Sequence, residues 1–465
     1  MPQEHYDLVV IGSGPAGQKG AINAAKLGKR VGIADAALAL GGTCLHTGTI
    51  PSKSLREAVL FLSGYRQKAF YGQSYAVQHR ITFEDLALRA NEVITRELEV
   101  IRDQLARNRI EILEGLATFV DEHTLEIDCG EEAQRVTADY VLIACGARPA
   151  HSETVPVDGK QIFDSDQFVS PARKSQELAR SLMVVGAGVI GVEYASMAAA
   201  LGANVTVIDQ REDVLEFADR EMIEALFYHL RDHNTTLRFG EKVVRVEKDS
   251  RERVVAHLES GKRVTGETLL YTVGRQANAD RLKLDCAGVN VDPRGRIPVD
   301  GNFRTSAQHI YAAGDVIGFP SLASTSMEQG RVATCHMFGA PFSHAPALLP
   351  YGIYTIPEIS MVGKTEEQLT EQKIPYEVGT ARFEELARGQ MIGDRTGRLK
   401  LLFGPDDLKL LGVHIIGDGA AELVHIGQMV MSYGGTVELL RDSVFNYPTL
   451  AEAYKVAAFD GLNRL

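Results

Sequence analysis

Two short apolar runs in the chain each end in a glycine-rich turn. Residues 6–11 precede Gly-Ser-Gly-Pro-Ala-Gly, and residues 182–185 precede Gly-Ala-Gly-Val-Ile-Gly. A helix-compatible stretch follows each turn, as far as Gly28 in the first case and Gly202 in the second. A short apolar run bounded by turn residues is typical of a buried strand. The pattern therefore predicts strand, turn and helix at two places in the chain.

A second strand pattern follows each helix and closes on an acid. Residues 31–35 end in Asp35, and residues 205–209 end in Asp209. Each acid lies 23 residues after the first glycine of its turn. The matched distance indicates an internal duplication.

The duplicated turns have the glycine spacing of a dinucleotide site. The first glycine allows a tight turn, the second lets a pyrophosphate approach the backbone, and the third permits close helix–strand packing. The phosphates then lie at the helix N-terminus, and the acid accepts hydrogen bonds from the adenosine ribose. One such motif also joins strands to helices where no nucleotide binds, but two copies with matched acids favour binding. The predicted nucleotide contacts are Gly12, Gly14, Gly17 and Asp35, and Gly186, Gly188, Gly191 and Asp209.

The repeat extends beyond the glycine turns. Charge-rich alternating segments at 117–127 and 242–258 predict small antiparallel meanders. Apolar strands follow and end at Gly146 and Gly274, and an arginine follows each of them, as Arg148 and Arg275. We assign Ala117, Gly146 and Gly274 to the cofactor-binding residues. Two complete dinucleotide units in one chain indicate electron or hydride transfer between their ligands.

The remaining segments carry no nucleotide motif. Residues 82–105 have apolar positions at helical spacing and a charged opposite face, with Thr82 and Asp85 as a capping box. This pattern predicts a covering helix without a catalytic role. From about residue 343, strand patterns at 380–383 and 398–403 and helical patterns at 420–433 and 450–462 predict a third domain.

Composition narrows the class of protein. The 465 residues suggest roughly three domains of ~150 residues. The net charge of −12, without basic runs, argues against a nucleic acid or an anionic membrane as partner. No uncharged apolar stretch approaches the ~18–20 residues of a membrane span, and the N-terminus does not resemble a signal peptide. The five cysteines show no CxxC spacing. We therefore expect a cytoplasmic protein that binds small molecules and no metal.

Further motifs make the chain similar to the pyridine nucleotide–disulfide oxidoreductases. They occur in order at 41–53, 141–149, 186–191, 310–315, 327–331 and 354–358, so the resemblance covers nearly the whole chain. It implies an α/β fold with two Rossmann-like dinucleotide-binding domains, for FAD and NAD(P), and a C-terminal α+β dimerisation domain. The implied limits are 1–155 and 276–342 for the FAD domain, 156–275 for the NAD(P) domain and 343–465 for dimerisation.

The resemblance also implies roles for individual residues. Lys53 would approach flavin N5 and pair with Glu193, and Asp315 would accept a hydrogen bond from the ribityl chain. The alternatives are a surface lysine, an ordinary helix acid and an N-cap, the last of which is compatible with ribityl binding. Gly42, Thr43 and Cys44 would also line the FAD site.

Two departures from the family pattern affect the same half of its mechanism. The disulfide reductases carry two cysteines separated by four residues. Here Cys44 takes the first place and Thr49 the second, and a hydroxyl cannot form a disulfide. The family's C-terminal His-Pro-Thr reads Tyr447-Pro448-Thr449, although its acidic partner remains as Glu452. A tyrosine is a poor general base at neutral pH.

The other cysteines suggest no separate chemistry. A nucleophilic Cys44–His46 pair is disfavoured, because residues so close in sequence rarely bring their side chains into hydrogen-bond contact and no third group is evident. Cys44 is instead expected to pack near FAD. We predict that the remaining cysteines are packing residues, namely Cys129, Cys145, Cys286 and Cys335.

The losses at Thr49 and Tyr447 leave the contact between nicotinamide and flavin intact. The resemblance then implies a flavoenzyme that takes hydride from NADPH and gives it to NAD⁺ in the same pocket. Asp209 would suit the 2′-hydroxyl of NAD, and Arg211 is either a partner for the 2′-phosphate of NADP or a solvated charge. A homodimer is the minimum assembly, with Tyr447 and Glu452 completing the neighbouring site.

Two other functions remain open. An NAD(P)H-dependent quinone or dye reductase is the enzymatic alternative, because a flavin without a disulfide partner can reduce any small acceptor that reaches it. A catalytically silent flavoprotein that senses NADPH or acts as a binding partner is the other. The presence of both Lys53 and Glu193 argues against it.

Overall fold

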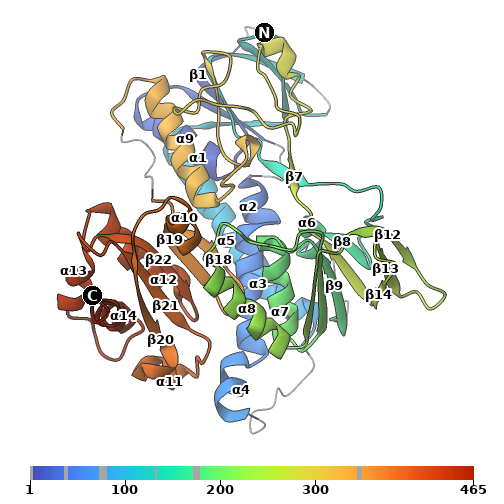
Figure 1. The fold of residues 1–465 in the computed structure, drawn as a ribbon. Coiled ribbons are helices and arrows are strands. Elements are labelled where there is room, and N and C mark those ends of the chain that lie inside the picture. The colour runs from blue at the N-terminus through green and yellow to red at the C-terminus, as the bar shows by residue number, and fades with distance from the viewer. Residues whose placement is uncertain (1–3, 36–39, 73–80, 131–132, 171–177, 343–347) are drawn as a thin grey trace.

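The first unit of the fold is built on a seven-stranded sheet at the top of Figure 1. The computed structural model describes residues 4–35, 40–72, 81–130, 133–170, 178–342 and 348–465. Parallel strands run in the order β3-β2-β1-β6, and β17 adds to the far side of β6. These strands are β1 (Glu4–Ile11), β2 (Val31–Asp35), β3 (Glu111–Glu114), β6 (Ala133–Ile143) and β17 (Ile310–Ala312).

Along one of its edges, the long strand β6 pairs with two strands in succession. Its first half pairs antiparallel with β5 (Thr124–Asp128), which pairs with β4 (Leu116–Phe119), and this confirms the first predicted meander. Its second half pairs parallel with β17 on the same edge, while the opposite edge of β6 pairs parallel with β1 from Val136 to Ile143. Helices α1 (Pro15–Lys26) and α9 (Ala323–Met337) pack tightly on each other. A Cβ added at Gly330 would lie 2.1 Å from the carbonyl oxygen of Ala16.

The second unit repeats this plan as a parallel sheet in the order β11-β10-β9-β15-β8. A separate antiparallel sheet, β12-β13-β14, forms the second predicted meander. The strands are β8 (Ile162–Asp164), β9 (Ser181–Val185), β10 (Asn204–Asp209), β11 (Thr235–Phe239), β12 (Val243–Lys248), β13 (Val254–Leu258), β14 (Arg263–Gly266) and β15 (Thr268–Tyr271). The helices are α6 (Ser165–Phe168), α7 (Val189–Ala200) and α8 (Arg220–Asp232).

A short two-stranded ribbon joins the two units. The chain leaves the first unit through β7 (Ala147–Pro149) and returns through β16 (Arg275–Ala277), and these strands pair antiparallel. Because β17 then completes the first sheet, the second unit is inserted within the first.

The C-terminal unit is an antiparallel sheet in the order β18-β19-β22-β21-β20 with helices packed on it. Its strands are β18 (Tyr351–Ile353), β19 (Ile359–Gly363), β20 (Glu377–Arg382), β21 (Arg398–Phe403) and β22 (Leu410–Ile416). Its helices are α10 (Glu366–Glu371), α11 (Ala387–Ile392), α12 (Ala420–Ser432), α13 (Val437–Asp442) and α14 (Glu452–Leu462). The predicted fold class is thus confirmed, whereas the domain limits stay predictions, and residue 343 lies outside the described residues.

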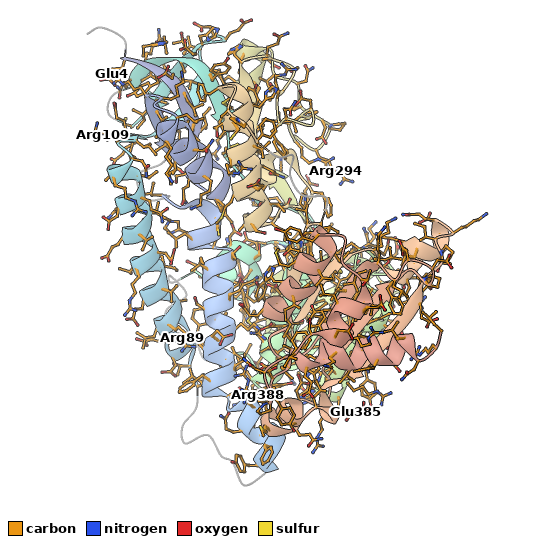
Figure 2. All side chains as sticks on the ribbon, turned by 90° about the vertical axis from the view of Figure 1, so that its left-hand side faces the viewer. Glu4, Arg89, Arg109, Arg294, Glu385 and Arg388 are labelled. Carbon is orange, nitrogen blue, oxygen red and sulfur yellow. The ribbon has the colours of Figure 1, made fainter. Side chains whose placement is uncertain are left out.

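Two long helices lie at the centre and along one side of the molecule. Helix α3 (Thr49–Leu62) follows the short α2 (Gly42–His46) and precedes α4 (Tyr65–Tyr71), while α5 (Phe83–Arg107) packs beside α3. Figure 2 shows α5 lengthwise, with charged side chains on its outer face. The capping box of Thr82 and Asp85 is formed as predicted, and the apolar face of α5 is buried.

Candidate active site

A single cleft of about 1960 Å³ brings the sequence-predicted residues together. Residues from both nucleotide units and from the C-terminal unit line it. The turns after β1 and β9 both open onto this cleft, so each predicted nucleotide motif faces the same space. A ligand bound at one turn therefore shares the cleft with a ligand bound at the other.

The three glycines of each turn have different structural roles. The first has a positive φ, 99° at Gly12 and 105° at Gly186, a region that residues with a Cβ rarely adopt. The third is packed against the first, because a Cβ at Gly17 would lie 1.9 Å from the carbonyl oxygen of Gly12. Gly191 repeats that distance of 1.9 Å to the oxygen of Gly186.

The middle glycines leave room for a ligand. A Cβ at Gly14 or Gly188 would meet no atom within 4 Å, and both residues line the cleft. Each is the N-cap of a 12-residue helix, so free backbone N–H groups point into that open space. These turns fit the phosphates of a dinucleotide.

The two acids hold their own turns in the same way. Asp35 accepts a hydrogen bond from the backbone N–H of Ser13 at 2.6 Å, and Asp209 accepts one from that of Ala187 at 2.7 Å. Ser13 and Ala187 occupy equivalent places, one residue after the first glycine. The duplication therefore extends to individual hydrogen bonds.

Lys53 and Glu193 form an ion pair across 140 positions of sequence. The Lys53 Nζ lies 2.8 Å from Oε2 and 3.1 Å from Oε1 of Glu193, whose side chain is only 4% exposed. The backbone N–H of Tyr354 donates to Glu193 Oε1 at 2.8 Å, and the Tyr354 ring centroid lies 4.9 Å from Lys53 Nζ. All three residues line the cleft, and each comes from a different unit. Sequence reasoning missed the contact of Tyr354, although its motif was noted.

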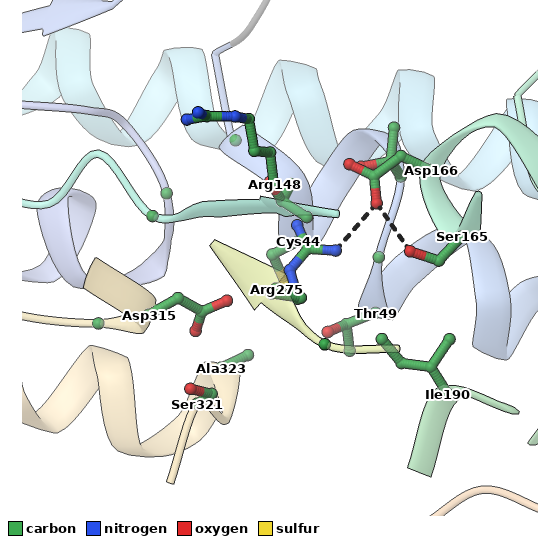
Figure 3. Close-up of a pocket in the computed structure, with 18 of the residues that line it drawn as sticks. Cys44, Thr49, Arg148, Ser165, Asp166, Ile190, Arg275, Asp315, Ser321 and Ala323 are labelled. Atoms are coloured by element: carbon green, nitrogen blue, oxygen red, sulfur yellow. Dashed lines mark hydrogen bonds and ion pairs between the residues drawn. The ribbon is translucent and has the colours of Figure 1, made fainter. Parts of the chain in front are cut away.

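Cys44 faces Thr49 across the junction of α2 and α3. Burial raises the pKa of the Cys44 thiol, and a hydrogen bond with the Thr49 hydroxyl partly opposes this. Figure 3 draws both side chains in the cleft lining. His46 does not act as a base for Cys44, because its Nε2 is engaged by the carbonyl oxygen of Leu40 at 2.9 Å.

Arg275 lines the cleft. The sequence indicated it only as one of two arginines that follow equivalent strands. Its guanidinium donates to Asp166 Oδ1 at 3.0 Å and to the carbonyl oxygen of Ala147, so it ties the ribbon to the second unit. Its Nε is buried and has no hydrogen-bond partner among the described residues. The equivalent Arg148 pairs with Asp280 at 2.8 Å. The recurrence of arginine after both strand ends was the available signal.

Other predicted cofactor residues also border the cleft. Burial raises the pKa of Asp315, and the charge of Arg275 opposes that rise. Asp315 is not an N-cap, since it begins a 3-10 turn capped by Gly314 and α9 starts only at Ala323. The cleft lining also includes Gly42, Thr43, Ala117, Gly146, Asp209, Arg211 and Gly274.

Tyr447 and Glu452 lie outside this cleft. Tyr447 is 73% exposed on the C-terminal unit, just before Glu452 at the start of α14. Neither is among the lining residues, so the structure of one chain does not bring them to Lys53.

The packing role predicted for the other cysteines is right at one position and wrong at two. Cys335 is buried in α9, whereas Cys129 and Cys286 are exposed. Cys129 follows the end of β5 and precedes Gly130, so it sits in a turn, and Cys286 lies on the outer side of a 3-10 turn whose Leu284 and Ala287 are buried. Cys145 is half-buried and lines the cleft, and burial raises the pKa of its thiol to about 12.

Two other kinds of feature are absent from the part of the chain that the structure describes. Among the residues that the structure describes, no group of three or more His, Cys, Asp or Glu side chains is arranged to hold a metal ion. None of the helices in the described ranges is long and apolar enough to cross a membrane.

Comparisons with known proteins agree with the motifs and the fold. The family model described as pyridine nucleotide-disulphide oxidoreductase matches residues 6–330, and the model of that family's dimerisation domain matches residues 349–458. A Mycobacterium tuberculosis protein named soluble pyridine nucleotide transhydrogenase is 54% identical over 462 residues, which cover 99% of this chain and 98% of the relative. A Pseudomonas aeruginosa protein of the same name is 44% identical over 469 residues, covering all of both chains.

A solved structure has the same architecture throughout. The HOCl-induced flavoprotein disulfide reductase RclA from Escherichia coli matches with a TM-score of 0.87 and 27% sequence identity, over 98% of this chain and 99% of that one. Members of the matched family use a flavin together with NAD(P)H. The resemblance found in the motifs is confirmed: the chain belongs to the pyridine nucleotide-disulphide oxidoreductase family and is an oxidoreductase.

Proposed function

We propose that this chain transfers hydride reversibly from NADPH to NAD⁺ by way of bound FAD and without a redox-active disulfide. Relatives named soluble pyridine nucleotide transhydrogenase, 44–54% identical over nearly the full length, support this activity. The observation that carries the mechanism is at position 49, where the Cys44 thiol meets a hydroxyl. When bound, FAD accepts hydride from one nicotinamide and gives it to the next.

The residues of the cleft fit both nucleotides. In the first unit, the open space at Gly14 and the buried carboxylate of Asp315 would hold FAD. In the second unit, the space at Gly188 would hold the pyrophosphate of NAD(P), with Asp209 and Arg211 at the adenosine. The other residues assigned to these ligands are Gly12, Gly17, Asp35, Gly42, Thr43, Cys44, Ala117 and Gly146 for FAD, and Gly186, Gly191 and Gly274 for NAD(P).

Lys53 and Glu193 are the proposed catalytic pair. The lysine brings a fixed positive charge from the first unit, and the buried carboxylate from the second unit holds that charge in place. A preorganised charge stabilises negative charge that develops during the reaction without reorganising at that moment. The backbone N–H of Tyr354 donates to the carboxylate, so a residue from each of the three units holds the pair in place.

The same proposal includes a homodimer or larger homo-oligomer. The matched dimerisation domain supports it, as does the exposure of Tyr447 away from the cleft of its own chain. In such an assembly Tyr447 and Glu452 would complete the site of the neighbouring subunit.

Transfer between nucleotides can be measured directly. Purified, FAD-loaded enzyme is mixed with NADPH and a spectrally distinct NAD⁺ analogue, and a parallel reaction replaces the analogue with a quinone. We expect steady reduction of the analogue, at a rate above that of quinone reduction. Quinone reduction without transfer to the analogue would contradict the proposal and favour a quinone or dye reductase.

A second thiol at position 49 tests the argument from the missing disulfide. We expect Thr49→Cys to form a disulfide with Cys44 in part of the chains treated with oxidised dithiothreitol, because the hydroxyl it replaces already contacts that thiol. Thiol counting after denaturation would show the loss of two thiols per oxidised chain. Cys44→Ser/Thr49→Cys is the matched control, which cannot form this bridge.

The same variant should still fail to reduce disulfide substrates efficiently. Thr49→Cys alone still has Tyr447 at the place of the family's general acid/base. We predict that Thr49→Cys/Tyr447→His also gives no efficient turnover of a disulfide substrate. Efficient turnover of a disulfide substrate by the unaltered protein would contradict our interpretation of Thr49.

A further inference from the structure

Arg56 is a buried cation on α3, one turn after Lys53. Its side chain is only 5% exposed, and it stands three positions further along the helix. Residues three apart lie on the same face of a helix. Lys53 lines the cleft, whereas Arg56 is not among the lining residues. Helix α3 therefore presents two cations side by side, and Arg56 has no part in the contacts described so far.

Arg56 binds the segment that joins β18 to β19. Its Nε donates to the carbonyl oxygen of Thr355 at 3.0 Å, and its Nη1 lies 3.0 Å from Glu358 Oε1. Glu358 is 13% exposed and Thr355 is fully buried. Nη1 also donates to the neighbouring Glu57, but that side chain is exposed and anchors nothing. Because a buried guanidinium is costly unless its donors are paired, Arg56 and this segment hold each other in place.

The same segment also binds α7 of the second unit. The backbone N–H of Tyr354 donates to Glu193 Oε1 at 2.8 Å, and that of Ile356 donates to Ser196 Oγ at 3.0 Å. The Ser196 hydroxyl in turn donates to the carbonyl oxygen of Glu193 at 2.7 Å. Residues 354–358 thus contact α7 through N–H groups and α3 through a carbonyl oxygen and a carboxylate. Helices α3 and α7 themselves lie in contact at the centre of the molecule (Figure 1).

These contacts form a closed ring that begins and ends on α3. Lys53 pairs with Glu193, which accepts from the N–H of Tyr354. The backbone continues to Thr355, whose carbonyl oxygen accepts from Arg56. Arg56 returns to Lys53 through one turn of helix. A ring of contacts restrains each of its members more than an open chain does, so the place of the Glu193 carboxylate depends on Arg56.

We propose that Arg56 is a positioning residue for the reaction. It fixes the backbone of Tyr354 and Thr355, and through the Tyr354 N–H it holds Glu193 where the carboxylate can orient Lys53. The inference rests on the proposed function, in which Lys53 and Glu193 are the catalytic pair. Catalytic groups need such support, because a displacement of about 1 Å can cost roughly 100-fold in rate.

Amide exchange tests the positioning without any reaction. Hydrogen–deuterium exchange of the Tyr354 N–H is followed by mass spectrometry, in FAD-loaded enzyme with no other nucleotide added. We expect Arg56→Met to speed this exchange about 10-fold, because the backbone beside it loses its partner on α3. Arg56→Lys keeps the charge without the fork and should speed it only about 3-fold.

The rate of flavin reduction by NADPH gives the second readout. We expect Arg56→Met to lower the rate at saturating NADPH about 10-fold. The NADPH concentration for half-saturation should stay nearly unchanged, because Arg56 does not line the cleft. If Arg56 acts through Glu193, adding Arg56→Met to Glu193→Gln should slow the reaction by less than about 2-fold.

Lys400→Met is the control for the loss of a buried cation at a boundary between units. Lys400 is buried, pairs with Asp219 of the second unit at 3.0 Å and is not a cleft-lining residue. Where this variant is folded, we expect both readouts to equal those of the parent enzyme. Glu358→Gln covers the case in which Arg56→Met does not fold. It keeps Arg56 but removes its charged partner, and it should speed Tyr354 exchange about 3-fold.

Two outcomes would overturn the inference. One is exchange of Tyr354 at the parent rate in Arg56→Met, or in Glu358→Gln where the first variant does not fold. The other is equal slowing by Arg56→Met with Glu193 and with Gln at position 193. Failure of NADPH-to-NAD⁺ transfer, with the exchange pattern and the flavin-reduction rates as expected, would count against the proposed function alone.

Discussion

Lys53→Met is expected to slow the reduction of the bound flavin by saturating NADPH about 100-fold, the loss typical of removing one preorganised electrostatic group. The substitution removes the cation and leaves the Glu193 carboxylate buried without its partner. Stopped-flow absorbance of the flavin measures the rate. Because Glu193 itself becomes the unfavourable charge, Lys53→Met/Glu193→Gln should be slowed less than the sum of the two single variants predicts.

The matched control is Lys29→Met. Lys29 is exposed to a similar degree, 36% against 28% for Lys53, and lies 4.0 Å from Asp7, away from the cleft. We expect its rate to equal that of the parent enzyme. A Lys53→Met enzyme that is reduced as fast as this control would remove Lys53 from the catalytic pair.

Lys400→Met is expected to destabilise the protein by about 3–5 kcal/mol, as removal of one partner from a buried ion pair does. Lys400 lies on β21, 2% exposed, and its Nζ contacts Asp219 Oδ2 at 3.0 Å, Glu221 Oε2 at 3.2 Å and Glu366. Burial opposes its charge, yet the hydrogen bonds and charges of Glu366 and Asp219 raise the pKa of Lys400 above its ordinary value. The contact joins the C-terminal sheet to α8, so its loss affects two units at once.

Urea unfolding followed by circular dichroism measures this loss. Lys409→Met is the control, because Lys409 is 58% exposed and pairs with Asp407 on the surface of the same unit. Surface pairs contribute about 0–1 kcal/mol, so the control should unfold close to the parent. Asp219→Asn/Lys400→Met should recover part of the loss. Equal midpoints for Lys400→Met and Lys409→Met would refute the structural role given to Lys400.

The parts of the fold that could be predicted from the sequence are those that depend on short-range patterns of residues. The strand, glycine turn and helix of each unit follow from short-range spacing, and the capping box at Thr82 marks the start of α5 within one residue. The pairing of Lys53 with Glu193 spans two units, and only the family resemblance indicated it. Local periodicity carries no information on such a contact.

The contacts that escaped prediction depend on how the units pack. Arg275 and Asp166 are far apart in sequence and meet because β15 pairs with β8, which places Tyr271 opposite Asp164. The wrong predictions of burial for Cys129 and Cys286 have a related origin. Cysteine is generally buried, but this preference does not hold for a cysteine in a turn whose side chain faces outward. A general preference of a residue type could not locate those turns.

The late arrival of β17 has a consequence for synthesis on the ribosome. The sheet of the first unit is complete only after Ile310–Ala312 has paired with β6, and the whole second unit is translated before that strand. The second unit contains all its strands in one continuous stretch and can close without waiting for later chain. Domains generally fold as units during translation, and pairing between distant segments is slow. The inserted second unit is thus expected to fold first. The sheet of the first unit stays incomplete until its last strand, β17, has been translated.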